Sequence, residues 1–168
     1  NLAKMGKFET IVGLQGMYQE NQNFGEEILI PDAITNDIGF LVTSIFDIND
    51  LSSLQGGIRF DHRNLSSSSY EKEGPNMDSQ EITIDGVDRT FSNFTFSLGY
   101  KNVFFEKITS RINIASGFRA PNLAELTSFG VHHGSNRFEI GNPDLDSEQN
   151  FQFDLSLEYG NRHFEVFA

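Results

Sequence analysis

Residues 93–101 read NFTFSLGYK, and this short stretch decides the fold class. Apolar and polar side chains alternate along it: Phe94, Phe96, Leu98 and Tyr100 stand against Asn93, Thr95, Ser97 and Lys101. A repeat of two residues is typical of a β-strand with one apolar face, because successive side chains of a strand point to opposite sides. An amphipathic helix would repeat every 3.6 residues instead.

The same alternation recurs along most of the chain. It predicts antiparallel strands near residues 8–18, 37–48, 53–64, 91–101, 107–118 and 150–160, and the final HFEVFA reads as the start of a seventh strand. Apolar residues fill one face, while Gln, Asn, Thr, Ser and charged residues fill the other. The pattern therefore predicts an all-β protein, built as an antiparallel up-and-down meander of about seven strands.

The connections between these segments alternate regularly between long and short. In an outer-membrane barrel short turns join the strands at one end and long loops join them at the other. The segments reach roughly the nine to eleven residues with which a tilted strand crosses a bilayer. A soluble β-sandwich, with a role in adhesion or carbohydrate binding, is the alternative, since it also alternates but packs its apolar face on a second sheet. The pattern favours a segment of a large transmembrane β-barrel.

Composition narrows the function classes. The 168 residues carry a formal net charge of −12 and include 17 Phe but no Cys. The negative charge argues against nucleic acid as a partner, because phosphate binding needs Lys and Arg, and the missing Cys excludes a disulfide scaffold. The sequence contains neither a signal peptide nor a long apolar helix. Because HFEVFA reads as a strand cut in its middle, we expect the chain to be a piece of a longer protein.

One loop departs from the alternation, between GFRAPNLAEL and EIGNPDLDSE. Pro121 favours an extended Ala120, which ends the strand. Asn122 and Glu125 have the spacing of a capping box, which predicts a short helix from Asn122 to about Phe129 with Gly130 as its stop. Asn142 and Pro143 predict a turn, and Glu148 leads into the next strand.

These residues also carry a resemblance to a known family. GFRAPNLAEL followed by EIGNPDLDSEQN resembles the C-terminal half of the β-barrel of TonB-dependent outer-membrane receptors, and LSSLQGGIRFDHR is similar to another recurrent strand of that family. The positions that carry the loop motif are Arg119, Pro121, Asn122, Glu125, Gly141, Asn142, Pro143 and Glu148.

The resemblance implies a role in transport rather than catalysis. It implies that residues 1–168 are part of a barrel of about 22 strands with a plugged lumen, and that the plug and the other strands lie outside this chain. The full receptor would lie in the bacterial outer membrane, contact its lipid, and import a scarce nutrient such as an iron siderophore, haem or zinc with energy from the TonB complex. A segment cut from such a barrel is expected to self-associate.

Two sets of side chains are candidate sites. His132 and His133 lie in the long loop near Glu139, Asp144 and Asp146, and imidazole with carboxylate suits zinc or a metal chelate; simple solvation of the two histidines is the alternative. Arg59, Asp61, Arg63 and Arg111 are expected to face the lumen, where they would pair with one another, contact the plug or be hydrated. No catalytic motif occurs, and the sequence predicts neither an enzyme nor a bound cofactor.

Overall fold

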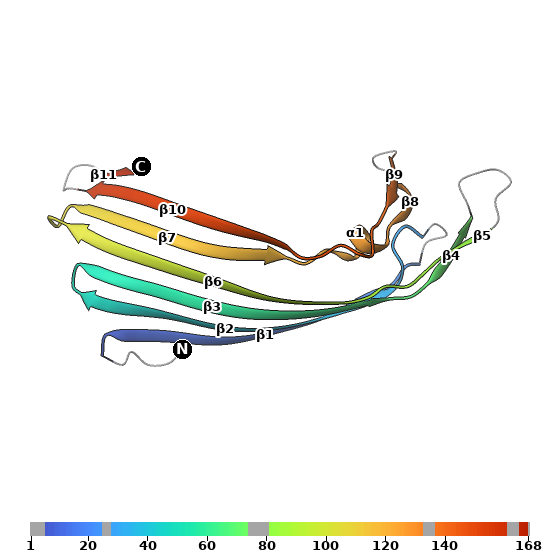
Figure 1. Ribbon diagram of the computed structural model, residues 1–168, viewed down its shortest axis with the longest axis horizontal. Helices are drawn as coiled ribbons and strands as arrows, with labels where there is room; N and C mark the ends of the chain where they lie inside the picture. The colour runs from blue at the N-terminus through green and yellow to red at the C-terminus, as the bar shows by residue number, and fades with distance from the viewer. Residues whose placement is uncertain (1–5, 25–27, 74–80, 133–136, 161–164, 168) are drawn as a thin grey trace.

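The structure, a computed structural model, describes residues 6–24, 28–73, 81–132, 137–160 and 165–167. One long sheet holds most of them (Figure 1). Its strands are β1 (Phe8–Asn21), β2 (Ala33–Asn49), β3 (Ser52–Ser67), β6 (Asp88–Phe104), β7 (Ile108–Arg119), β10 (Glu148–Gly160) and β11 (Glu165–Phe167). The remaining elements are β4 (Tyr70–Glu73), β5 (Glu81–Ile84), α1 (Leu123–Thr127), β8 (Phe129–His132) and β9 (Arg137–Ile140).

The sheet has the predicted topology. Its seven strands follow the order β1-β2-β3-β6-β7-β10-β11, and each strand pairs antiparallel with its neighbour in sequence. Between successive strands of this sheet, the long loops all leave from one end and the short turns from the other (Figure 1). The up-and-down meander is therefore confirmed.

Several strands extend further toward the long loops than the alternation indicates. β2 begins at Ala33, β3 continues to Ser67 and β6 begins at Asp88, whereas the alternation predicts 37, 64 and 91 for these limits. At the other end, Phe105 and Glu106 connect β6 to β7 with positive φ angles of 50° and 58°. Two positive φ angles in sequence are those of a type I′ turn, which matches the twist of a hairpin.

The two sides of the sheet differ in chemistry. We call the side that carries Phe94, Phe96 and Leu98 the apolar face, and the side that carries Arg59, Asp61 and Thr95 the polar face. Paired residues form rows across the apolar face, such as Leu14–Phe40–Phe60–Phe94 and Val12–Val42–Ile58–Phe96. Phe94 is 75% exposed and Phe151 is 73% exposed. Side chains this apolar and this accessible require a surrounding other than water.

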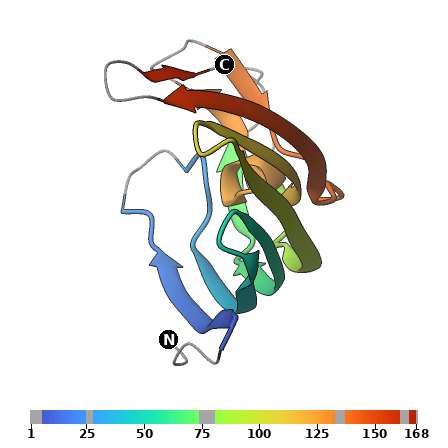
Figure 2. The same ribbon diagram turned by 90° about the vertical axis from the view of Figure 1, so that its left-hand side faces the viewer.

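A small core lies on the polar face, at the end with the long loops. Leu65, Val87, Phe91 and Leu126 are buried there, with Ala120, Leu123 and Leu145 packed against them. Viewed from one end, the strands follow an arc, and α1 lies within its curve (Figure 2). The helix at the start of the segment between β7 and β10 therefore lies over the polar face.

Three local expectations need correction. The helix covers only Leu123–Thr127 and ends with Ser128 as its C-cap, so Gly130 does not stop it but belongs to β8. The loops contain two hairpins, β4–β5 and β8–β9, that the alternation did not indicate. In these short strands the periodic signal is too brief to separate a hairpin from an irregular loop.

Among the described residues, none of the helices has the length and apolar character to span a membrane.

Candidate functional site

Ion pairs cover the polar face where β2 and β3 approach the long loops. Arg63 Nε donates to Asp37 Oδ1 at 2.8 Å, and its Nη2 donates to Asp37 Oδ2 at 2.6 Å. Asp37 and Arg63 are direct partners in the register of the two strands, so the sheet itself sets this bidentate geometry. The arginine therefore has a counter-ion within the chain.

A second pair forms along β3. Arg59 and Asp61 are two residues apart and so point to the same face; Arg59 Nε donates to Asp61 Oδ2 at 2.6 Å. Arg59 Nη2 also donates to Gln15 Oε1 on β1 at 3.0 Å. The guanidinium reaches across Gly39, where a Cβ atom would stand 2.6 Å from Arg59 Nη2. Glycine at this position thus leaves room for the contact across three strands.

The ion pairs surround a hollow in the polar face. Its volume is about 350 Å³. The lining residues of the polar face are Gln15, Asp37, Gly39, Arg59, Asp61, Arg63, Phe91 and Arg119. The pairs Arg59–Asp61 and Arg63–Asp37 are each neutral as a unit, while Arg59 and Arg63 retain further N–H donors. The hollow is therefore suited to hydrogen bonding more than to holding a strong charge.

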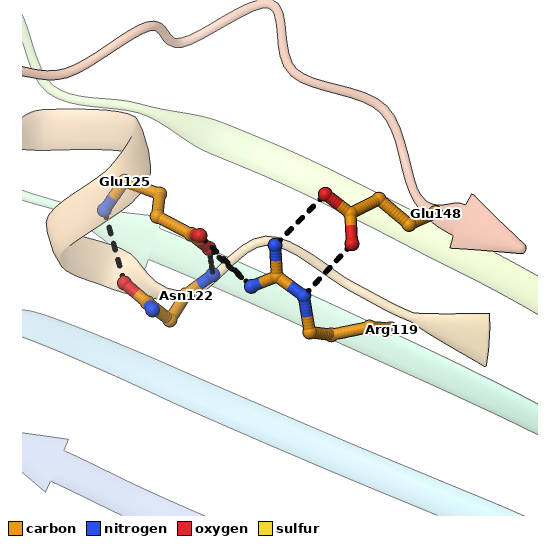
Figure 3. Close-up of polar contacts among 4 residues, drawn as sticks. All are labelled: Arg119, Asn122, Glu125 and Glu148. Carbon is orange, nitrogen blue, oxygen red and sulfur yellow. Dashed lines mark hydrogen bonds and ion pairs between the residues drawn. The ribbon is translucent and has the colours of Figure 1, made fainter.

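Arg119, the last residue of β7, joins the loop to the sheet. Its Nη1 donates to both carboxylate oxygens of Glu125 in α1 at 2.8 Å. Its Nε and Nη2 donate to the two oxygens of Glu148, the first residue of β10, at 3.1 and 3.0 Å. Figure 3 shows the guanidinium between the two carboxylates. One side chain thus links the beginning and the end of the segment 120–147, which we call the inward loop.

The start of α1 is tied to the same arginine. Asn122 Oδ1 accepts from the Glu125 backbone N–H at 2.9 Å, and Glu125 Oε2 accepts from the Asn122 backbone N–H at 2.9 Å. This is the predicted capping box, which satisfies backbone donors that a helix start leaves free. Because Glu125 serves both the cap and Arg119, the helix start and the strand end hold each other in place.

The turn that follows β9 is held against the same helix. Asn142 N–H donates to the Glu125 carbonyl at 2.8 Å, and Leu145 N–H donates to the Asn142 carbonyl at 3.3 Å, which closes a β-turn with Pro143 at its second position. A Cβ atom on Gly141 would lie 2.6 Å from the backbone nitrogen of Thr127. Only glycine allows this close approach of the two backbones.

A second arginine fastens the inward loop from β6. Arg89 Nη2 donates to the Leu145 carbonyl at 2.9 Å and contacts Asp146 Oδ1 at 3.3 Å, while its Nη1 donates to the Pro143 carbonyl. Asn93, which is 6% exposed, donates from Nδ2 to Ser147 Oγ at 3.1 Å. Together with the buried Leu126, these contacts fix the loop to the polar face.

The charge environment of Arg119 alters the ionisation of Glu125. Glu125 has a lowered pKa because it accepts the backbone N–H of Asn122 and then the guanidinium of Arg119. The Glu125 carboxyl is therefore ionised at neutral pH.

Comparison with known proteins identifies this architecture. The family model described as "TonB dependent receptor-like, beta-barrel" matches residues 12–167. The chain belongs to the TonB-dependent receptors. This is a family of receptors of the bacterial outer membrane. The search of curated proteins found no match.

Solved receptor structures share the fold. One titled "Copper transporter OprC" is 14% identical with a TM-score of 0.75, and the match covers 98% of this chain and 27% of that receptor. A double mutant of the Serratia marcescens hemophore receptor HasR, in complex with HasA and heme, is 19% identical with a TM-score of 0.73, and 90% of this chain covers 26% of it. The ferric-catecholate import receptor Fiu from E. coli K12 is 17% identical with a TM-score of 0.51, and 94% of this chain covers 27% of it. The chain thus spans about a quarter of these receptors.

The structure brings the motif residues of the loop together. Most of them are joined by hydrogen bonds, whereas Pro121 contributes by packing. Arg119, Asn122, Glu125 and Glu148 form one hydrogen-bonded group, and Gly141, Asn142 and Pro143 form the turn beside it. Pro121 is buried. Of the four charged residues expected to pair with one another, Arg59 and Asp61 do so. Arg63 pairs with Asp37 instead, and Arg111 Nη1 donates to Glu158 Oε2 at 2.8 Å.

The histidine site stays a prediction. His132 ends β8, where its backbone pairs with Arg137, and His133 lies outside the described residues. Within the part of the chain that the structure describes, no three His, Cys, Asp or Glu side chains are grouped so that they could hold a metal ion.

The sequence alone did not indicate Arg89 and Asn93. The alternation places Asn93 on the polar face. Arg89 also has an odd number, so it would fall on the same face if the strand were predicted to begin before residue 89. What the pattern could not show is that residues 143–147 return to β6. That approach depends on the buried Leu126 and the partly buried Leu145. The loop sequence does not distinguish these two leucines from exposed apolar residues.

Proposed function

We propose that this chain forms part of the wall of an outer-membrane receptor that imports a scarce nutrient, with energy supplied through TonB. In this proposal residues 1–168 are one section of the barrel, and the plug and the other strands are supplied by the rest of the receptor. The observation that carries the proposal is the inward loop, fastened over a polar face by Arg89 and Arg119. A fixed element of this kind narrows a wide lumen at the end where a ligand enters.

For the substrate we propose a metal or a metal chelate, such as an iron siderophore, haem or zinc. The titles of the similar structures support this class, since they refer to copper transport, to heme with its hemophore and to ferric-catecholate import. The histidine pair in the inward loop supports it independently, because imidazole is a common metal ligand. The partners implied are the plug, TonB and the ligand.

Uptake in cells tests the proposal. The gene for the full receptor is deleted, and accumulation of iron supplied as ferric catecholate, iron supplied as haem, zinc and copper is measured in starved cells. We expect uptake of one of these to fall in the deletion strain and to return on complementation. Diffusion of a small neutral sugar is the control and should not change. Unchanged uptake of all four metal sources would exclude the proposed substrate class.

A further inference from the structure

The apolar face does not stay apolar up to the long loops. Beyond the row Leu14–Phe40–Phe60–Phe94 lies the row Gly16–Ile38–His62–Ser92, and beyond that the row Tyr18–Asn36–Asn64–Thr90. Apart from Gly16 and Ile38, the side chains of these two rows carry hydrogen-bonding groups. We call six of them the outward polar patch: Tyr18, Asn36, His62, Asn64, Thr90 and Ser92.

The depth of the patch follows from strand geometry. Two residues rise about 6.8 Å along a strand, and with a tilt of about 40° each row adds about 5 Å of height. Tyr100 lies three rows from Phe94 on the same face, at the level expected of an interfacial aromatic girdle. The patch therefore lies about 20–25 Å above Tyr100, at the upper limit of an apolar band about 25 Å tall. Its side chains face the head groups of the outer leaflet.

The patch is ordered by contacts between strands. His62 Nδ1 and Ser92 Oγ are 2.8 Å apart, and Asn64 Nδ2 donates to Thr90 Oγ1 at 3.2 Å. Each of these pairs is a direct partner pair in the register of β3 and β6. Asn36, Thr90 and Ser92 are exposed, and Tyr18 is 64% exposed. The pairs leave further donors and acceptors of the same side chains free to bond outward.

Charge decides which head-group chemistry fits. The patch contains no Lys, Arg, Asp or Glu, and the next row adds the acidic residues Glu20 and Asp88. The arginines Arg59, Arg63 and Arg89 of β3 and β6 occupy odd positions and face the lumen. Among the six described side chains of the patch, a phosphate group would meet no Lys or Arg, and the acidic row above would repel it. Sugar hydroxyls are neutral and both donate and accept hydrogen bonds.

We propose that the outward polar patch binds the sugar hydroxyls of outer-leaflet glycolipid, and that it does so without using the lipid's phosphates. The patch continues directly from the lipid-facing rows, so a lipid molecule whose chains lie against Phe60 and Phe94 places its head group beside Asn64 and Thr90. This inference depends on the outer-membrane location and not on the transported nutrient.

Lipid retention by the full receptor tests the proposal. The receptor is reconstituted in vesicles of phospholipid alone, of phospholipid with lipopolysaccharide, and of phospholipid with dephosphorylated lipopolysaccharide, and is then extracted in mild detergent. Mass spectrometry measures the glycolipid retained per receptor. The share of retention that belongs to the patch is the difference between the wild-type protein and a patch variant, and we expect this difference to be equal for the native and the dephosphorylated glycolipid. A difference seen only with the phosphorylated glycolipid would overturn the proposal.

A paired variant locates the contact. Asn64→Leu with Thr90→Val removes two members of the patch without adding charge, and retention should fall roughly fivefold or more, as for the loss of an ordinary hydrogen bond. Asn113→Leu with Thr95→Val makes the same changes on the polar face and should leave retention unchanged. Equal retention by the two double variants would show that the patch is not the site. If the double variant fails to fold, Thr90→Val alone tests the same contact.

Discussion

Arg119 Nη2 lies 3.0 Å from Glu148 Oε1, although 29 residues separate the two in sequence. They are direct partners in the pairing of β7 with β10, so the antiparallel register closes the base of the inward loop. The same guanidinium reaches Glu125 in α1. The loop is thus fastened at its two ends and at its helix by one side chain.

Arg119→Ala should release the inward loop while the barrel remains folded. The change removes the bonds to Glu125 and Glu148, and two carboxylates then face each other without a cation. We expect proteolytic cleavage within residues 120–147 of the full receptor to become about two- to tenfold faster. Arg111→Ala is the matched control, because it removes the exposed pair with Glu158 at the other end of the sheet. Equal cleavage rates in both variants would contradict the anchoring role.

Acid should loosen the same loop. The pKa of Glu125 lies below its ordinary value of 4.5, because its carboxylate accepts the Asn122 backbone N–H and the Arg119 guanidinium. A carboxylate whose pKa is lowered by folding contributes its full stabilisation of the folded loop above about pH 4.5. This stabilisation is lost as the pH falls through the lowered pKa. Hydrogen exchange in residues 120–128 of the wild-type receptor should therefore rise below about pH 4.5. In Arg119→Ala this dependence should be smaller, and an equal dependence would refute the assignment.

Phe96→Arg should impair assembly of the receptor. Phe96 lies on the apolar face between Phe94 and Leu98. If this face meets lipid, as we expect, an arginine near the bilayer midplane costs about 2–4 kcal/mol. Thr95→Arg, one residue away on the polar face, is the control. Folded and unfolded barrels are separated by electrophoresis without heating. Equal folded fractions for the two variants would contradict the assigned faces.

The isolated chain should associate with itself in water. β1 and β11 are edges of the described sheet, and the exposed Phe rows form an apolar surface larger than soluble monomers tolerate. Sedimentation of residues 1–168 without detergent should show oligomers or aggregates. A single sharp monomer species would contradict the exposure of the Phe rows.

The histidine pair of the inward loop can be tested directly. Replacing His132 and His133 together with Ala in the full receptor should weaken the binding of zinc or haem if either residue contributes a ligand. Gln149→Ala, at the start of β10, is a control without imidazole loss. Unchanged affinity for both zinc and haem would leave the two histidines as solvated loop residues.

The sequence by itself determined the class, the topology and the two faces of this sheet. Alternation at a period of two assigns Phe96 and Thr95 to opposite sides wherever the strand lies, because the geometry of a strand is local. The capping box of Asn122 and Glu125 and the turn at Pro143 are local in the same way, and the structure confirms them. Local patterns also indicate the strand ends, though β2, β3 and β6 extend further because cross-strand pairing continues past the alternating residues.

Only the tertiary structure decided where the loop goes. The pairing of Arg119 with both Glu125 and Glu148, and the contacts of Arg89 with Leu145 and Asp146, join residues that no local rule relates. They form because Leu126 buries itself against Leu65 and Phe91 on the polar face. Burial of apolar surface has no direction along the chain, so its outcome depends on which surfaces the whole sheet brings within reach.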